Sequence, residues 1–186
     1  MQAILDACAE GHIPASPSLL ICNNPSAFAA SRAREFGLDV EILNGKTHPN
    51  PEDLDTAIRD ALLAHQTDLV VLAGYMKRIG PRVLSTFTNR ILNIHPSLLP
   101  KFGGRGMYGL RVHEAVIKAG ETETGATVHL INENYDEGPI LQQRSIPVHS
   151  HDTPESLQQR TLEIEHSLYP DTVSRIAKGE IALPEN

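Results

Sequence analysis

The amino-acid sequence predicts an α/β fold built on a doubly wound, mostly parallel sheet. Apolar runs of strand length alternate along the chain with longer segments of helical periodicity. The run at residues 68–74 is apolar on successive positions, which is typical of a central parallel strand covered on both faces. Residues 124–131 and 140–148 alternate like an antiparallel pair instead. Together these patterns predict a Rossmann-like sheet with right-handed crossovers and a late antiparallel strand.

Composition narrows the class of protein. At 186 residues the chain is most simply one domain over residues 1–186. Its 16 basic and 23 acidic residues give a net charge of −7, which argues against nucleic acid or an anionic membrane as the main partner. Cys8 and Cys22 are too few for a disulfide framework, and no apolar run has the length of a membrane span. We therefore expect a cytoplasmic protein, and the sequence leaves monomer and homodimer open.

The first half of the chain alternates between helix and strand. Asn50 gives the clearest helix start, because it is a cap residue followed by Pro51 at the first helical position and by acids in the first turn. The expected elements are a helix at 1–11, a strand at 18–22, a helix at 26–36, a strand at 38–43, a helix from 51 to about 65 and a strand at 68–74.

The second half continues this alternation. Pro81 opens a short helix, and a strand follows that ends at Asn93 and His95. Residues 101–110 form a loop with four glycines, which is compatible with a close ligand approach but lacks the G-K-[ST] ending of a phosphate loop. The remaining elements are a helix at 112–119, strands at 124–131 and 140–148, and a last helix from 153 to about 178.

The end of the strand at Asn93 and His95 is the first candidate site. Because side chains alternate along a strand, Asn93 and His95 point the same way while Ile94 points into the packing. Ligands of open α/β sheets bind at the carboxyl ends of the strands, where this pair lies. An amide donor beside an imidazole can hold a developing oxyanion. The alternative is a strand end whose polar side chains only cap a turn.

Asp136 is the candidate partner of that pair. It lies in the Gly/Pro turn between the last two strands, and His129 lies on the strand that leads into this turn. A carboxylate beside His95 would favour the protonated imidazole and so provide a general acid. Asp136 could instead only cap its own turn. An amide, an imidazolium and a carboxylate together predict transfer of a carbonyl carbon to an amine.

Three motifs in order resemble the folate-dependent formyltransferases, and among them the phosphoribosylglycinamide formyltransferases. They are N-I-H-P-S-L-L-P at residues 93–100, D-E-G-P at 136–139 and E-H-S-L-Y-P at 165–170, preceded by A-G-Y-M at 73–76. The first motif is shared by the wider family, whereas the order of all of them is more specific. The resemblance covers essentially the whole chain.

The resemblance implies transfer of a formyl group from 10-formyltetrahydrofolate to the amino group of glycinamide ribonucleotide, in purine biosynthesis, without a metal. It implies that Asn93 and His95 stabilise the oxyanion and relay the proton, and that Asp136 sustains the charge on His95. Folate would be bordered by Met76, Lys77, Arg78 and Ile79, by Asn93 and by residues 132–138. Glu165 would hold the ribose of the ribonucleotide.

Two departures from the family pattern stand out. Many members carry an arginine that helps to bind folate where this chain has Pro51, so that role is not carried over. The family also begins with a strand and a G-x-G-S-N loop that binds the substrate phosphate. Met1 aligns after that loop. We therefore expect the sheet to lack a central strand and the phosphate loop. A start placed too late in the sequence is the favoured explanation, and a chain that really began at Met1 would be expected to have low stability and little activity.

Three alternatives remain open. Formyltetrahydrofolate hydrolase uses water in place of the amine, and this relative carries an extra regulatory domain. Methionyl-tRNA formyltransferase needs a tRNA-binding domain, which an acidic chain does not favour. A folate-binding remnant without catalysis comes from a different functional class.

Overall fold

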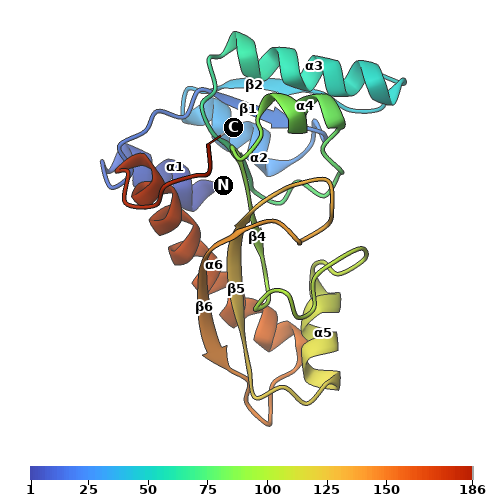
Figure 1. Cartoon of the computed structure of the whole chain (residues 1–186), viewed down its shortest axis with the longest axis vertical. Coiled ribbons are helices and arrows are strands. Elements are labelled where there is room, and N and C mark those ends of the chain that lie inside the picture. The colour runs from blue at the N-terminus through green and yellow to red at the C-terminus, as the bar shows by residue number, and fades with distance from the viewer. Residues whose placement is uncertain (186) are drawn as a thin grey trace.

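The computed structural model describes residues 1–185 and has alternating helices and strands in the predicted order (Figure 1). The helices are α1 (Gln2–Ala9), α2 (Phe28–Glu35), α3 (Pro51–Ala64), α4 (Pro81–Thr86), α5 (Leu110–Lys118) and α6 (Pro154–Ala177). The strands are β1 (Leu19–Cys22), β2 (Asp39–Ile42), β3 (Val70–Leu72), β4 (Ile91–His95), β5 (Glu123–Leu130) and β6 (Ile140–Pro147). Every predicted element is present, although the central strand expected at 68–74 is shorter.

The strands pair in two ladders. β1 and β2 form a parallel two-stranded sheet, while the second sheet has the order β3-β4-β5-β6. β3 and β4 are parallel, and β5 runs antiparallel to both β4 and β6, which confirms the late antiparallel strand. Within residues 1–185, no ladder joins β1 to β3. The expectation that a central strand and a phosphate loop are lacking stays a prediction.

Apolar packing connects the two sheets, which no β-ladder joins within residues 1–185. One buried cluster contains side chains of α3, α4 and β4, and both β1 and β3 pack against it through partly buried residues. A second cluster lies on the opposite face, where β4 and β5 contact α6 and residues of α1 pack against it. The burial of apolar surface on both faces of β3 and β4 is the pattern that an α/β sheet requires.

Helix ends follow the local chemistry of the sequence. Asn50 accepts a hydrogen bond from the Glu52 N–H at 2.9 Å and so caps α3, with Pro51 at its first position. The buried Asp55 carboxylate accepts a hydrogen bond from the Arg82 N–H at 2.8 Å and thereby holds the start of α4. α6 begins with a capping box at Thr153 and continues through Pro170. These contacts fix the starts of α3, α4 and α6.

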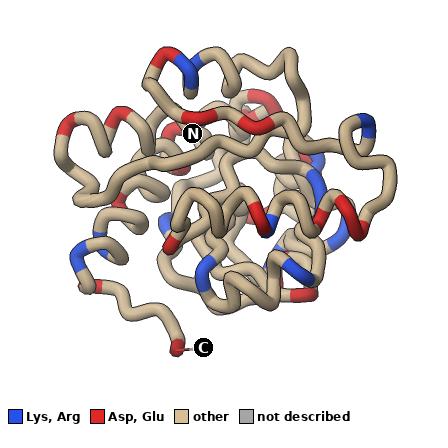
Figure 2. The backbone as a smooth tube through the Cα atoms, turned by 90° about the horizontal axis from the view of Figure 1, so that it is seen from above, with Lys and Arg blue, Asp and Glu red and all other residues tan. Residues whose placement is uncertain are grey.

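Charge is dispersed over the molecule. Acidic and basic segments alternate along the backbone in Figure 2, with no region of one sign dominating that view. Among residues 1–185, no helix combines the length and the apolar character that crossing a membrane needs.

Candidate functional site

The site is built on the ends of β4 and β5. In the antiparallel register Asn93 lies opposite His129, and His95 lies opposite Thr127. Residues two apart on one strand share a face, so the Asn93 and His95 side chains lie on the side that His129 also occupies. His95 and His129 are 4% and 1% exposed, respectively, and are therefore shielded from bulk water. The expectation that Asn93 and His95 point the same way agrees with these contacts.

His129 orients the Asn93 amide. The Nδ1 of His129 lies 2.9 Å from the carbonyl oxygen of Leu130, which only accepts, so Nδ1 carries the proton. Burial lowers the pKa of His129, while the Leu130 carbonyl and Asp136 raise it and His95 lowers it further. In this neutral tautomer Nε2 is an acceptor, and the Asn93 Nδ2 donates to it at 3.1 Å. The second Nδ2–H of Asn93 remains to stabilise a developing oxyanion.

Asp136 joins the two histidines. Its Oδ2 lies 3.6 Å from Nδ1 of His95, and its Oδ1 lies 3.7 Å from Nε2 of His129. Both distances are longer than a hydrogen bond, so the interaction is that of a carboxylate close to two rings. Asp136 has a φ of +56°, in the left-handed region, and its side chain is 13% exposed. The turn thus projects a carboxylate into a partly dry site, where electrostatic interactions are strong.

A hydrogen-bonded network fixes the turn that follows His95. The Thr127 hydroxyl donates to the Ser97 carbonyl at 2.6 Å and accepts from the Leu99 N–H at 3.1 Å. Gln143 donates to the same hydroxyl at 2.9 Å, and the Ser97 hydroxyl donates to the Lys101 carbonyl at 2.7 Å. Because Ser97 and Thr127 are fully buried, these bonds hold the turn in one conformation. Ser97 is accordingly a structural residue rather than a nucleophile.

The residues that the family resemblance assigns to folate form two facing loops. Met76 is 61% exposed, Ile79 is buried, and Lys77 and Arg78 are exposed. The Arg78 guanidinium donates to the Glu133 carbonyl at 3.1 Å and lies 5.8 Å from the centroid of the Tyr135 ring. The segment 76–79 is therefore in direct contact with the loop 132–138 that carries Asp136. Exposed apolar and aromatic side chains at these loops suit a flat heteroaromatic ligand.

Glu165 lies apart from the catalytic cluster. It is on α6, one turn before Tyr169, whose hydroxyl donates to the carbonyls of Leu72 and Leu92 at 3.1 and 2.9 Å. Burial raises the pKa of Glu165 to about 7, and the charge of the Met1 ammonium opposes this shift. Within residues 1–185 no hydrogen bond or ion pair joins Glu165 to Asn93, His95 or Asp136. The structure therefore brings three of the predicted residues together and leaves Glu165 near a separate hollow lined by Met1, Arg32 and His166.

The raised pKa of Glu165 predicts a pH-dependent stability. A carboxyl that is ionised in the unfolded chain above pH 4.5 but stays neutral in the folded chain up to about pH 7 destabilises folding progressively over that interval. We expect Glu165→Gln to remove this loss, so that at pH 8 it is more stable than the parent by up to about 3 kcal/mol. Denaturant unfolding at pH 4 and pH 8 measures the difference.

Glu163→Gln is the matched control for this measurement, because Glu163 lies on the same helix and is exposed. Its stability relative to the parent should be nearly the same at both pH values. If the free energy of unfolding of Glu165→Gln relative to the parent is the same at pH 4 and pH 8, the raised pKa of Glu165 is contradicted.

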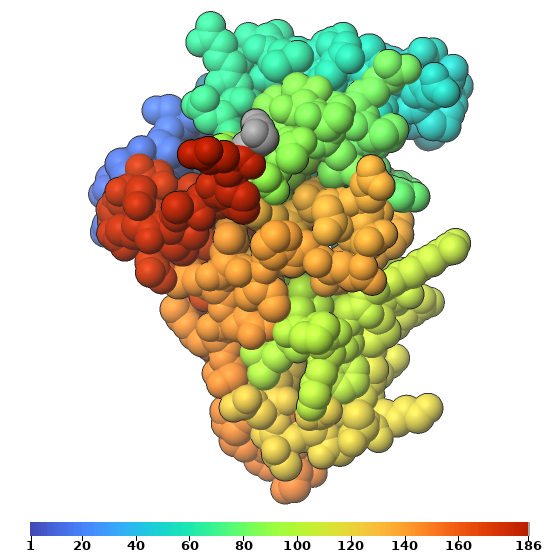
Figure 3. All heavy atoms as spheres, viewed as in Figure 1, coloured from blue at the N-terminus to red at the C-terminus, as the bar shows by residue number. Residues whose placement is uncertain are grey.

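Two features of the site were not assigned from the sequence. The sequence places His129 on the strand before the Asp136 turn, but it does not predict the contact of His129 with Asn93, which depends on the β4–β5 register. The sequence predicts the glycine loop at 101–110 but not its partner. This loop lies against the loop of Asp136 in Figure 3, and the Gly104 N–H donates to the Asp136 carboxylate. No group of three or more metal-ligating side chains occurs among residues 1–185.

Comparison with known proteins shows the family of this chain. A model described as "Formyl transferase" matches residues 1–173. A phosphoribosylglycinamide formyltransferase of Haemophilus influenzae is 38% identical over the whole chain, which covers 85% of that protein. A chloroplastic protein of the same name from Arabidopsis thaliana is 39% identical, and the chain spans 64% of its length.

The fold of this chain is also similar to that of a solved structure. The crystal structure named glycinamide ribonucleotide transformylase 1 from Symbiobacterium toebii superposes with a TM-score of 0.90 at 39% identity. The match covers 98% of this chain and 84% of that one. Fold and sequence therefore agree with these proteins over nearly all of the chain.

Proposed function

Because this chain belongs to the formyl transferase family, alongside the phosphoribosylglycinamide formyltransferases, we propose that it transfers a formyl group from 10-formyltetrahydrofolate to the amino group of glycinamide ribonucleotide. The observation that carries this proposal is the convergence of Asn93, His95 and Asp136 from two segments that are about 40 residues apart. These groups supply an oxyanion donor, a proton carrier and a charge that sustains it. Residues 1–186 act as one formyltransferase domain.

The chain contributes positioning and electrostatic stabilisation rather than a nucleophile. As the amine nitrogen bonds to the formyl carbon, the Asn93 amide N–H and the protonated His95 ring stabilise the negative charge on the formyl oxygen. His95 carries the proton that the amine loses to the folate nitrogen, whose bond to the formyl carbon breaks. Asp136 holds the His95 ring in its charged form. No proton is gained or lost overall.

The binding roles are those that the family resemblance implies. Met76, Lys77, Arg78 and Ile79 border the folate on one side, with Asn93 at its reactive end and the loop 132–138 on the other side. The contact of Arg78 with Glu133 and Tyr135 supports this pairing of the two loops. Glu165 binds the ribose of the ribonucleotide. The partners are thus two small molecules, and a cytoplasmic monomer or homodimer without nucleic-acid or membrane partners fits the net charge of −7.

A labelled formyl group tests the proposal directly. The purified chain is given 10-formyltetrahydrofolate with the formyl carbon labelled, with and without glycinamide ribonucleotide. We expect the label to appear in the ribonucleotide, at a rate that depends on the concentration of both substrates.

The same measurement separates the alternatives. Release of labelled formate at an equal rate with and without the ribonucleotide would make the chain a hydrolase. Binding of the folate, measured by calorimetry, without any release of the formyl group would make it a non-catalytic remnant. Either outcome overturns the proposed function.

A further inference from the structure

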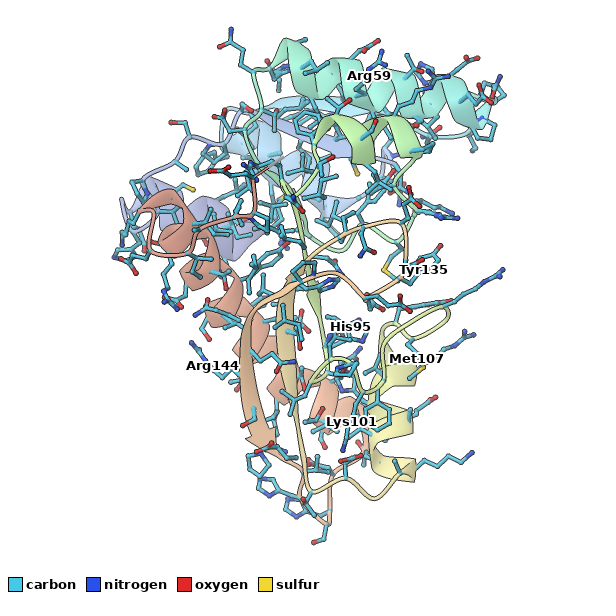
Figure 4. All side chains as sticks on the ribbon, viewed as in Figure 1. Arg59, His95, Lys101, Met107, Tyr135 and Arg144 are labelled. Atoms are coloured by element: carbon cyan, nitrogen blue, oxygen red, sulfur yellow. The ribbon has the colours of Figure 1, made fainter. Side chains whose placement is uncertain are left out.

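We propose that residues 102–104 form a backbone clamp that fixes the proton on Nε2 of His95 and leaves Nδ1 as the ring nitrogen that gains and loses a proton. This inference deepens the proposed function and rests on it. The clamp consists of two backbone groups. The Phe102 carbonyl contacts Nε2 of His95, and the Gly104 N–H donates to the Asp136 carboxylate. Figure 4 shows His95 beside this loop, with Lys101 on one side and Tyr135 on the other.

The first half of the clamp determines the state of Nε2. This nitrogen of His95 lies 2.8 Å from the Phe102 carbonyl oxygen. A carbonyl oxygen only accepts, so Nε2 must carry a hydrogen in both the neutral and the charged ring. Phe102 has a φ of +56°, which is uncommon for a residue other than glycine. The surrounding turn therefore holds this carbonyl in an orientation that the local chain would not choose.

The second half of the clamp holds the carboxylate. The Gly104 N–H donates to Oδ2 of Asp136 at 2.8 Å, and the same oxygen is the one that lies 3.6 Å from Nδ1 of His95. Gly104 has a φ of +96°, where a side chain is strongly disfavoured. At Gly103 a Cβ would lie 2.6 Å from Cδ2 of Leu99 and 3.1 Å from Cβ of Asp136. The two glycines thus allow the backbone to approach both catalytic side chains.

The neighbouring histidines do not compete for the proton. Burial, together with the charge of His95, lowers the pKa of His113, on α5, to about 4. Burial also lowers the pKa of His129. The lowered pKa of each of these two rings favours its neutral form near pH 7. With Nε2–H donated to the Phe102 carbonyl, only Nδ1 of His95 can give a proton to the departing folate nitrogen, and the bare Nδ1 then takes up the proton that the attacking amine loses.

Nitrogen-15 NMR of the histidine rings tests the assignment without any need for turnover. Protonated and bare ring nitrogens differ in chemical shift, so the spectrum of the neutral ring identifies its tautomer. In the parent chain we expect His95 to keep its hydrogen on Nε2 in both charge states. In Gly104→Ala we expect a mixture of tautomers, because the loop can no longer hold Phe102 and Asp136 together. Assignment of the His95 signals uses their loss in His95→Ala.

Gly106→Ala is the matched control. Gly106 lies in the same loop with a φ of +90°, and a Cβ there meets nothing within 4 Å, as at Gly104. The two variants therefore introduce similar backbone strain, but only Gly104 contacts Asp136. We expect Gly104→Ala to lower kcat about 10- to 100-fold while each KM changes by less than about threefold, and Gly106→Ala to keep kcat within about threefold.

Three outcomes would overturn the clamp. One is a bare Nε2 in the neutral His95 ring of the parent chain. Another is an equal loss of kcat in Gly104→Ala and Gly106→Ala, which would mean that only loop strain matters. The third is an unchanged tautomer in Gly104→Ala. A parent chain that shows the expected tautomer but no formyl transfer would instead refute the proposed function and leave the clamp intact.

Discussion

Replacement of His95 by alanine is expected to lower kcat for formyl transfer by about 10²- to 10⁴-fold, the range typical of a lost general acid or base. The ring lies 3.6 Å from Asp136 through Nδ1, and alanine has no group that can carry a proton at this position. Steady-state kinetics with both substrates measure the loss. The chain should still fold, because the turn after His95 is held by Thr127 and Ser97 independently of the ring.

Asp136→Asn completes this test, since it removes the charge but keeps the size of the side chain. We expect it to lose most of the activity as well, because a neutral amide no longer sustains the imidazolium. His149→Ala is the control, as His149 is an exposed residue near the start of α6. Turnover near the parent level in either His95→Ala or Asp136→Asn would refute the assigned role, provided that circular dichroism shows both variants to be folded.

Gly138→Ala, at the end of the loop 132–138, is expected to cause a large loss of stability. A Cβ at Gly138 would collide with the backbone carbonyl of Leu130, and it would lie 2.8 Å from the carbonyl carbon of that residue. Backbone atoms of a paired strand cannot move aside as a flexible side chain can. The loop or β5 must therefore shift, at a cost of about 3 kcal/mol. Denaturant unfolding gives the change in free energy.

The same shift should reach the catalytic carboxylate, because Asp136 is only two residues from Gly138. We expect residual activity of the folded fraction of Gly138→Ala to fall together with stability. Gly45→Ala is the control, since a Cβ at Gly45 meets nothing within 4 Å and the residue does not have a positive φ. If Gly138→Ala and Gly45→Ala have the same unfolding midpoint, the prediction is contradicted, because the Leu130 backbone then moves at little cost in free energy.

Much of the architecture follows from local features of the sequence. Pro51 after the Asn50 cap places the start of α3, and the alternating pattern of the last two strands distinguishes β5 and β6 from the parallel strands. The position of Asn93 and His95 at the end of β4 also follows, because the period of a strand puts both on one face. Periodicity does not predict the two separate ladders, since pairing between β1 and β3 is a matter of contact in space.

The sequence by itself therefore determined the order of the elements and the residue types of the candidate catalytic groups. Only the tertiary structure decided that Asp136 meets both His95 and His129, that His129 orients Asn93, and that a glycine loop binds the catalytic pair. The physical reason is that most of these contacts depend on the approach of segments about 30 to 40 residues apart, and that the glycine loop binds through backbone groups. Every residue carries such an N–H and carbonyl, so residue type alone does not reveal which of them reach a catalytic side chain.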